Sequence, residues 1–374
     1  MPNIVIVGGG AGGASLAKDL SAKLPKIGPD YKLILITSRD CYVHMPAGLR
    51  LNVSPSSRLE ETALIPFDNL FTNGPGTIKY GTVVSIESDG KATGGNVVLE
   101  GGEKIEYRYL VVATGSVWEG PLAALTGKKE NLIDSVNVWR ENFKKSKAVV
   151  IVGAGSAGLE LAGELRDEYP NMEISIVHSD PLPLNSVYPD SFRIDVLKRW
   201  RKRGIFFVFD DRIIDIPEGP ITTVTTQKGE KLNADVVVAV RGGKPNTELF
   251  HSLGDSVYDE KKFVKVTPTL QLPQHPDIFA LGDIISFQEQ KSLAKVPAQV
   301  SVVLSNITSL ITGKSPKSVY KGSTEGIFIT NGKNHGAGYL GILWGLKFGD
   351  TIVSMAKGKT LFVEMSHKTF GVKA

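Results

Sequence analysis

The sequence predicts an α/β protein with two domains of parallel sheet and helix and a small α+β domain at its C-terminus. Three observations lead to this prediction. The chain has 374 residues, and at about 150 residues per domain this length suggests two or three domains. Its 41% hydrophobic and 22% charged residues are ordinary for a globular protein, which excludes a disordered or collagen-like chain. Finally, glycine is enriched, at 40 of 374 residues, and clusters of glycine occur where a strand is predicted to lead into a helix.

The first strand–helix unit lies at the N-terminus. The β-branched run at 3–7 reads as a buried parallel strand, and the pattern G-x-G-x-x-G follows it before an apolar helix and a second strand at 32–37. In such a loop the first glycine makes a tight turn, the second allows close approach of a pyrophosphate, and the third allows the helix to pack on the strand. The residues of this loop are Gly8, Gly9, Gly10, Ala11, Gly12 and Gly13.

The second unit repeats this order about 145 residues later. A strand at 148–152 leads into a second G-x-G-x-x-G pattern, and a further strand is predicted at 173–178. One such pattern alone is weak evidence, but two copies in the same strand–loop–helix context indicate two dinucleotide-binding folds. The nucleotide-binding residues of the second loop are Gly153, Gly155, Ser156 and Gly158.

Two further strand ends favour a flavin as one of the two dinucleotides. The strand from Tyr109 ends in Ala113-Thr114-Gly115, and the strand from Asp277 ends in Gly282-Asp283. The Asp283 carboxylate can accept a hydrogen bond from a ribityl hydroxyl, while Gly282 permits close approach. We therefore expect FAD as the cofactor and NADH or NADPH as the co-substrate.

Together these motifs resemble the flavoproteins with two Rossmann-like dinucleotide-binding domains. The resemblance implies that the NAD(P)H domain is inserted into a split FAD domain. We expect the FAD domain at 1–115 and 255–320, the NAD(P)H domain at 116–254, and the C-terminal domain at 321–374.

Four segments resemble one branch of this class, the AMID-type or ferroptosis-suppressor branch of the apoptosis-inducing-factor-like flavoproteins. They are the loop from Tyr42 to Arg50, the second glycine motif with its helix, and the C-terminal stretches 331–338 and 357–363. The C-terminal matches separate this branch from the type II NADH dehydrogenases. The resemblance implies an FAD-dependent NAD(P)H:quinone oxidoreductase, in which a hydride passes from NAD(P)H to the flavin and electrons then pass to a ubiquinone-type acceptor.

The resemblance also assigns roles to individual residues. Arg50, Val83 and Asp283 match FAD contacts together with the first glycine loop. Glu160 matches an acid near the nicotinamide, Lys357 matches a lysine that assists reduction of the acceptor, and Phe362 matches a residue of the quinone tunnel. A lysine near the flavin makes chemical sense because its charge stabilises the reduced ring.

Each of these roles has a structural alternative. Glu160 lies in the first turn of a helix, where an acid is favourable anyway. Lys357 can be a solvated surface charge, and Phe362 can belong to the core. Lys291 and Lys295 are further candidates for the lysine, and His44 can be a hydrogen-bonded structural histidine.

The ends of the second strands depart from the usual pattern. An acidic residue normally binds the adenosine ribose there, but the first unit has Thr37-Ser38-Arg39 and the second has His178-Ser179-Asp180. The side chains of Thr37, Ser38 and Arg39 can still contact the FAD adenosine. Because no carboxylate stands at the usual place beside His178, we expect both NADH and NADPH to serve.

The composition and the terminal sequences indicate which binding partners and which cellular location to expect. The single cysteine, Cys41, excludes an internal disulfide and a dithiol relay within the chain, and we expect no metal site. The net charge of +4 gives no reason to expect nucleic acid as a partner. No signal peptide or transmembrane helix is evident, and Pro2 excludes N-myristoylation. We therefore expect a cytoplasmic protein with a quinone-type substrate.

Two segments leave an alternative open. The stretch 339–348 is apolar with one charge and can dock on a membrane or a lipid droplet, form a buried strand pair, or make a homodimer contact. The basic run 198–203 can bind an anionic surface or be the solvated face of a helix. Two rival functions also remain: a type II NADH dehydrogenase of a respiratory chain, and a low-turnover redox death effector that binds nucleic acid.

Overall fold

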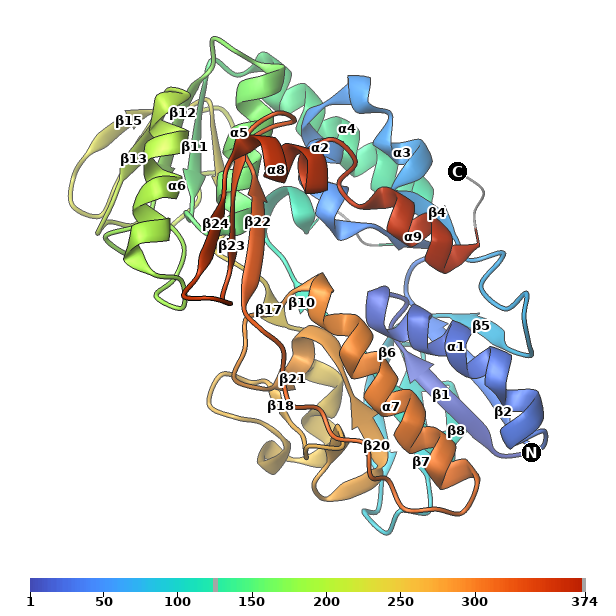
Figure 1. Ribbon diagram of the computed structural model, residues 1–374. Helices are drawn as coiled ribbons and strands as arrows, with labels where there is room; N and C mark the ends of the chain where they lie inside the picture. The colour runs from blue at the N-terminus through green and yellow to red at the C-terminus, as the bar shows by residue number, and fades with distance from the viewer. Residues whose placement is uncertain (124–126, 372–374) are drawn as a thin grey trace.

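The computed structural model describes residues 1–123 and 127–371 and confirms the α/β fold class (Figure 1). Its first large sheet has six strands in the order β19-β20-β9-β1-β2-β5, and β1 pairs in parallel with both β2 and β9. These strands are β1 (Asn3–Val7), β2 (Lys32–Thr37), β5 (Thr77–Tyr80), β9 (Tyr109–Val112), β19 (Gln271–Leu272) and β20 (His275–Ala280). Helices α1 (Ala11–Ile27) and α7 (Val296–Ile311) lie side by side against this sheet.

The second large sheet has four parallel strands in the order β13-β12-β11-β16. Its strands are β11 (Ala148–Val152), β12 (Glu173–Val177), β13 (Ile205–Val208) and β16 (Val236–Ala239). The long helices of this part of the chain are α4 (Lys129–Lys145), α5 (Ser156–Glu168) and α6 (Asp190–Lys202). In α6, the basic run 198–203 includes the fully buried Trp200, while Lys198, Arg201 and Lys202 are exposed, as on the solvated face of a helix.

The chain passes between the two sheets at one place. Strand β10 (Ser116–Val117) leaves the first sheet and pairs antiparallel with β17 (Lys244–Pro245), where the chain comes back. Leu249 and Phe250 already belong to the hydrophobic core around the first sheet. The returning chain therefore reaches that core a few residues before the predicted boundary at 254.

Smaller elements complete these two bodies. An antiparallel sheet of β6 (Val83–Ser88), β7 (Gly95–Leu99) and β8 (Lys104–Tyr107) belongs to the first. The segment after β2 forms the paired strands β3 (Cys41–Val43) and β4 (Leu64–Pro66), with α2 (Gly48–Val53) and α3 (Leu59–Thr62) between them. Apolar side chains of this segment pack into the same core as those of the second sheet. It therefore connects the two bodies.

The C-terminal domain lies across both bodies (Figure 1). Its antiparallel sheet consists of β22 (Gly326–Thr330), β23 (Gly336–Leu340) and β24 (Leu346–Phe348). Helix α8 (Asp350–Val353), a π-helical turn at Ser354–Gly358 and helix α9 (Val363–Phe370) follow. In the described part of the chain, no helix is long and apolar enough to cross a membrane.

Candidate nucleotide-binding and redox site

The two glycine loops have nearly the same backbone. Gly8 and Gly153 adopt φ values of 113° and 117°, which side-chain-bearing residues rarely adopt. A Cβ on Gly13 would lie 2.0 Å from the Gly8 carbonyl oxygen, and a Cβ on Gly158 would lie 1.9 Å from that of Gly153. The third glycine of each motif therefore lets the helix pack against the loop.

The residues just before α1 and α5 face open space. Gly10 and Gly155 are the N-caps of these helices, and a Cβ on either glycine would meet no atom within 4 Å. Unpaired backbone N–H groups at the start of a helix favour an anion at such a position. Each loop is thus shaped to receive a phosphate group.

Both loops open into one cavity of about 2580 Å³. Most of the predicted site residues line it, whereas Gly13, Arg50 and Gly158 do not. The predicted residues that line the cavity are Gly8, Gly9, Gly10, Ala11, Gly12, Thr37, Ser38, Arg39, Val83, Ala113, Thr114, Gly115, Gly153, Gly155, Ser156, Glu160, His178, Gly282, Asp283, Lys357 and Phe362.

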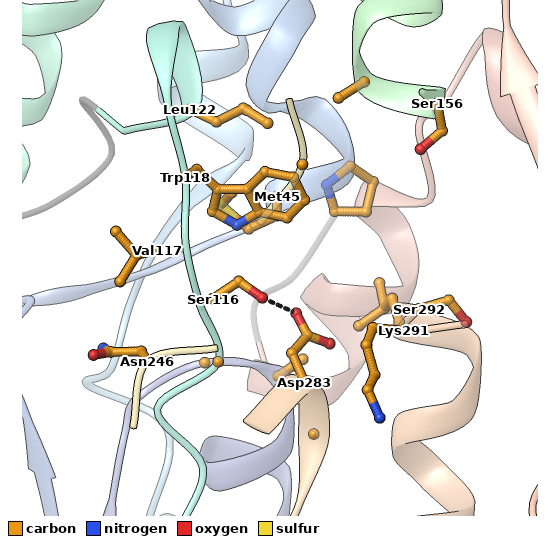
Figure 2. A pocket seen from close by; sticks show the side chains of 18 of the residues that line it. Met45, Ser116, Val117, Trp118, Leu122, Ser156, Asn246, Asp283, Lys291 and Ser292 are labelled. Atoms are coloured by element: carbon orange, nitrogen blue, oxygen red, sulfur yellow. Dashed lines mark hydrogen bonds between the residues drawn. The ribbon is translucent and has the colours of Figure 1, made fainter. Parts of the chain in front are cut away.

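The two predicted flavin-binding strand ends meet in the wall of the cavity. Figure 2 shows Ser116 donating a hydrogen bond from Oγ to Asp283 at 2.8 Å. The Gly282 N–H donates to Oε1 of the buried Gln299 at 2.7 Å. The turn at Gly282-Asp283 is thereby fixed to α7 on one side and to the start of β10 on the other.

His178, at the end of β12, faces the cavity with one unsatisfied nitrogen. Its Nδ1 accepts a hydrogen bond from the Ala154 N–H at 3.2 Å, so the proton of the neutral ring is on Nε2. Nε2 is buried and has no hydrogen-bond partner among the described residues. Burial lowers the pKa of His178, which keeps the ring neutral. The side chain therefore lies in the cavity wall beside the second glycine loop, with Nε2 3.9 Å from the Asp180 carboxylate.

Glu160 and Lys357, predicted separately, form an ion pair in the cavity wall. Lys357 Nζ lies 2.6 Å from Glu160 Oε1 and 3.1 Å from the Phe328 carbonyl oxygen. Glu160 Oε1 also accepts from the Thr330 N–H at 3.0 Å. The two side chains are only 13% and 12% exposed. This contact joins α5 to the π-helical turn of the C-terminal domain.

Arg50 is not at the cavity surface, although the resemblance implied an FAD contact. Its guanidinium makes two hydrogen bonds with the Glu164 carboxylate, at 2.7 and 2.9 Å, and both side chains are buried. Helix α2 places Arg50 against α5, so the side chain joins these two helices. As the structure stands, Arg50 can act on a bound nucleotide only through its neighbours.

His44 also joins parts of the chain that are distant in sequence. Its Nε2 donates to the Leu361 carbonyl oxygen at 2.6 Å, so Nδ1 accepts from the Ser366 hydroxyl at 2.7 Å. The side chain is buried, and burial lowers its pKa. The structure thus supports the structural alternative for His44, which anchors α9 to the loop after β2 at the edge of the cavity.

The two further candidate lysines also line the cavity. Lys291 Nζ donates to the Ile285 carbonyl oxygen at 2.7 Å, and burial lowers its pKa. Lys295 is buried and forms ion pairs with Glu325 at 2.7 Å and Glu289 at 3.5 Å. Both lysines therefore have structural partners in this wall.

A family model decides the classification of the chain. The model described as pyridine nucleotide-disulphide oxidoreductase matches residues 2–306. The chain belongs to the pyridine nucleotide-disulphide oxidoreductase family. As in other flavoprotein oxidoreductases of this family, its cofactor is FAD and its reductant is NADH or NADPH.

Curated relatives in this family agree with the branch identified from the motifs. The FAD-dependent oxidoreductase FVFD30 of Flammulina velutipes is 44% identical over 319 residues, which cover 85% of this chain and 98% of that protein. Ferroptosis suppressor protein 1 of Homo sapiens is 26% identical over 376 residues, which cover 98% of this chain and 95% of that protein. Among solved structures, the sulfide:quinone oxidoreductase of Aquifex aeolicus has a TM-score of 0.75 at 19% identity and covers 99% of this chain and 92% of its own; it is evidence for the fold.

The residues of the cavity fit the cofactors of the family. Open space lies at Gly10 and at Gly155, and Asp283 lines the same cavity. The unsatisfied Nε2 of His178 lies at the second nucleotide site. FAD would be held by the first glycine loop and the Gly282-Asp283 turn, and NAD(P)H by the second loop.

Sequence reasoning missed the way in which α5 uses its two glutamates. Glu160 and Glu164 are four residues apart, so both project from the same face of the helix. Two acids on one largely buried helical face would have indicated two nearby cations. The sequence could not identify these cations, because Arg50 is 114 residues from Glu164 and Lys357 is 197 residues from Glu160, and each pair meets only in the fold.

Proposed function

We propose that the protein is an FAD-dependent NAD(P)H:quinone oxidoreductase. The observation that carries the proposal is the Glu160–Lys357 ion pair, which lies in the wall of the nucleotide cavity where the C-terminal domain closes it. A positive charge held there by a buried carboxylate suits a reaction that places negative charge on a ring system.

Thiol chemistry does not suit this cavity. Cys41 is the single cysteine of the chain, it is buried, and burial raises the pKa of its thiol to about 11. It is absent from the described residues that line the cavity. Electrons that arrive from NAD(P)H must therefore leave to an acceptor that diffuses in.

The C-terminal domain offers a surface that suits a planar, apolar acceptor. Phe328, Tyr339, Phe362, Met365 and Phe370 line its side of the cavity. Aromatic and thioether side chains pack well against a flat conjugated ring. These residues support a quinone as the acceptor, with Phe362 next to it.

Lys357 has one donor left for such a ligand. An ammonium group carries three N–H donors, and Lys357 uses one toward Glu160 and one toward the Phe328 carbonyl oxygen. The third can donate to a quinone oxygen and deliver a proton to it. The contact with Glu160 Oε1 at 2.6 Å fixes the position of Lys357 Nζ in the cavity wall.

The bound flavin supplies the two-electron chemistry between the nicotinamide and the acceptor. The remaining requirements fall on the residues of this chain. The glycine loops hold the two nucleotides, Asp283 and the Gly282 turn orient the flavin side, and Lys357 Nζ provides a proton. The overall reaction is NAD(P)H plus a proton plus quinone giving NAD(P)⁺ plus quinol.

Rapid mixing under anaerobic conditions tests this proposal. The holoenzyme should lose its yellow absorbance on mixing with NADH or NADPH and recover it on mixing with a short-chain ubiquinone. Lys357→Gln should slow the second step by roughly tenfold to a hundredfold, while the first changes less. Lys359→Gln is the matched control, because Lys359 is two residues away and exposed.

Two outcomes would refute the proposal. One is a protein that is colourless after gentle purification and stays so when FAD is added. The other is a reduced holoenzyme that fails to return electrons to any soluble quinone while it does so readily to a disulfide or a protein acceptor.

A further inference from the structure

We propose that the turn between β23 and β24 is a docking device for an anionic lipid surface. The turn comprises Ile342, Leu343, Trp344 and Gly345, and Leu346 follows at the start of β24. This inference does not depend on the quinone acceptor proposed above.

Apolar side chains at this turn project into solvent. Trp344 is fully exposed and Leu343 is 72% exposed, while Ile342 and Leu346 are 40% and 37% exposed. An apolar cluster of this kind, left uncovered in a monomer, marks an interaction site. By contrast, Trp200 in the second body is completely buried.

The backbone conformation of the turn is also unusual for large apolar residues. The Gly345 N–H donates to the Ile342 carbonyl oxygen at 2.8 Å, and the two residues between them, Leu343 and Trp344, have φ values of 47° and 65°. Positive φ at both central positions is the geometry of a type I′ hairpin turn, for which Asn-Gly is the preferred sequence. Two bulky apolar residues occupy these positions although they find no cover within the protein, which indicates a partner outside it.

The rest of the hairpin is firmly anchored, so the turn is held away from the core. Tyr339 packs its ring against Phe192 and Tyr188 of the second body, with centroids 5.4 and 6.0 Å apart. Lys347 Nζ contacts the Ser191 hydroxyl at 2.8 Å. Figure 1 shows β23 and β24 lying beside α6. A rigid base with an apolar tip is suited to insertion into an interface.

Charge favours a lipid surface with anionic head groups. The C-terminal domain, residues 321–374, contains seven lysines and three acidic residues in sequence, although Lys357 is paired with Glu160 in the cavity wall. Beside the turn, the exposed Lys347 directly follows Leu346. Lysines attract anionic lipids, and a tryptophan is favourable at the boundary between head groups and acyl chains.

A second copy of the chain is a less suitable occupant. A stable dimer buries about 800 Å² on each partner, usually as a broad complementary patch. Four apolar side chains at one hairpin turn offer a small protruding contact. A lipid surface requires only that such a wedge be accessible and that basic groups lie in the same domain.

Vesicle flotation with the full-length holoenzyme tests the proposal. The protein should float with phosphatidylcholine vesicles that contain roughly one-third phosphatidylserine, and less with phosphatidylcholine alone or in high salt. The double substitution Leu343→Ser with Trp344→Ser should reduce binding about tenfold or more. Phe206→Ser is the control, since Phe206 is 53% exposed on β13 and lies outside the cavity lining.

Fluorescence reports whether Trp344 itself enters the lipid. The chain has four tryptophans, so the emission of the wild type is compared with that of Trp344→Phe, which keeps an apolar ring at the tip. On adding the anionic vesicles, the difference spectrum should shift to shorter wavelength and be quenched by brominated acyl chains. Reduction of a soluble quinone should be unchanged in every variant, which shows that the variants are folded.

Three results would overturn the inference. They are equal binding of the wild type and the double variant to anionic vesicles, no binding by either protein, and a concentration-dependent dimer in sedimentation that the double substitution dissociates. The last result would assign the turn to a contact between copies. A failure of quinone reduction in the wild type would bear on the proposed function and not on this surface.

Discussion

The two nucleotide-binding loops share a backbone but differ in the side chains that their helices carry. Gly8 and Gly153 have φ values within a few degrees of each other, and the third glycine of each loop is required for the same close contact. Neither α1 nor α5 has an acid in its first turn, so the first-turn position expected for Glu160 from the sequence was wrong. Helix α1 buries small and apolar residues against the first sheet, whereas α5 directs Glu160 and Glu164 into the protein, each toward a cation.

This difference separates the part of the protein that binds a nucleotide from the part that also places charged groups for the reaction. The first loop and its helix only shape a site, whereas the second helix also fixes charges on and behind the cavity wall. Glu164 is sealed in a bidentate pair with Arg50, while Glu160 and Lys357 lie at the cavity surface. Two carboxylates one helical turn apart thus have opposite consequences: we expect one to stabilise the fold and the other to serve turnover.

The largest effect expected from this comparison is on stability. Arg50→Met leaves the Glu164 carboxylate buried without its partner, and we expect the free energy of unfolding to fall by about 3–5 kcal/mol. Burial already raises the pKa of Glu164, so the abandoned carboxyl should take up a proton. Urea denaturation of the FAD-loaded protein measures the loss.

A double variant provides the control for this prediction. Arg50→Met combined with Glu164→Met replaces both charges with apolar side chains of similar size, and it should recover much of the lost stability. If the single and double variants unfolded at the same urea concentration, the pair would have no stabilising role of the kind inferred here.

The next effect is on catalysis, and it should separate the two glutamates of α5. Glu160→Gln removes the charge that holds Lys357, so kcat/KM for quinone reduction should fall by roughly tenfold to a hundredfold, or about 1.4–2.7 kcal/mol of transition-state stabilisation. Glu164→Gln should change kcat/KM much less while lowering the unfolding midpoint. Steady-state assays paired with thermal melts on both variants measure this split, and parallel losses in both readouts would contradict it.

A smaller effect should appear in the pH dependence of stability. His178 and His44 both have pKa values lowered by burial, whereas Thr37 at the corresponding place of the first unit does not titrate in this range. The unfolded chain then binds more protons than the folded one below the ordinary histidine pKa of about 6.5, so stability is present above that pH and is lost as the pH falls. We expect His178 to contribute to a loss of stability as the pH falls below about 6.5.

The substitution His178→Asn isolates that contribution. The asparagine amide can still accept from the Ala154 N–H but does not take up a proton, so part of the pH dependence should vanish while stability at neutral pH changes little. An unchanged pH profile of the melting temperature would show that His178 is not the titrating group.

The sequence predicted the features that depend on a local pattern of residues. It did not predict the ion pairs between residues that are far apart in the chain. The glycine loops and the Gly282-Asp283 turn were predictable because their conformations require glycine and their order along the chain follows the strands. The partner of Arg50 was not predictable, because α2 meets α5 only after the segment following β2 has packed between the two bodies. Glu160 and Lys357 are 197 residues apart, and their pairing likewise depends on the packing of the π-helical turn at Ser354–Gly358 against α5.

The smallest expected effect concerns the choice of coenzyme, which tests the second nucleotide site alone. The neutral ring of His178 carries its proton on Nε2, and the Asp180 carboxylate lies 3.9 Å from that nitrogen. Arg212 lines the same cavity. A donor serves a ribose hydroxyl or a 2′-phosphate, whereas the acid opposes the phosphate and the arginine favours it. These opposing charges predict that both coenzymes serve, with values of kcat/KM that differ by less than about a hundredfold, or 2.7 kcal/mol.

Two substitutions sharpen this expectation in opposite directions. Asp180→Asn should raise kcat/KM for NADPH by a few-fold and leave that for NADH nearly unchanged, because Asp180 is half exposed and its field is screened. Arg212→Gln should lower the value for NADPH alone. Neither change should alter the affinity of the apoprotein for FAD, since the flavin nucleotide belongs to the first loop. A discrimination above a hundredfold in the wild type, toward either coenzyme, would mean that one of these charges dominates and that the two sites differ more than their glycine loops suggest.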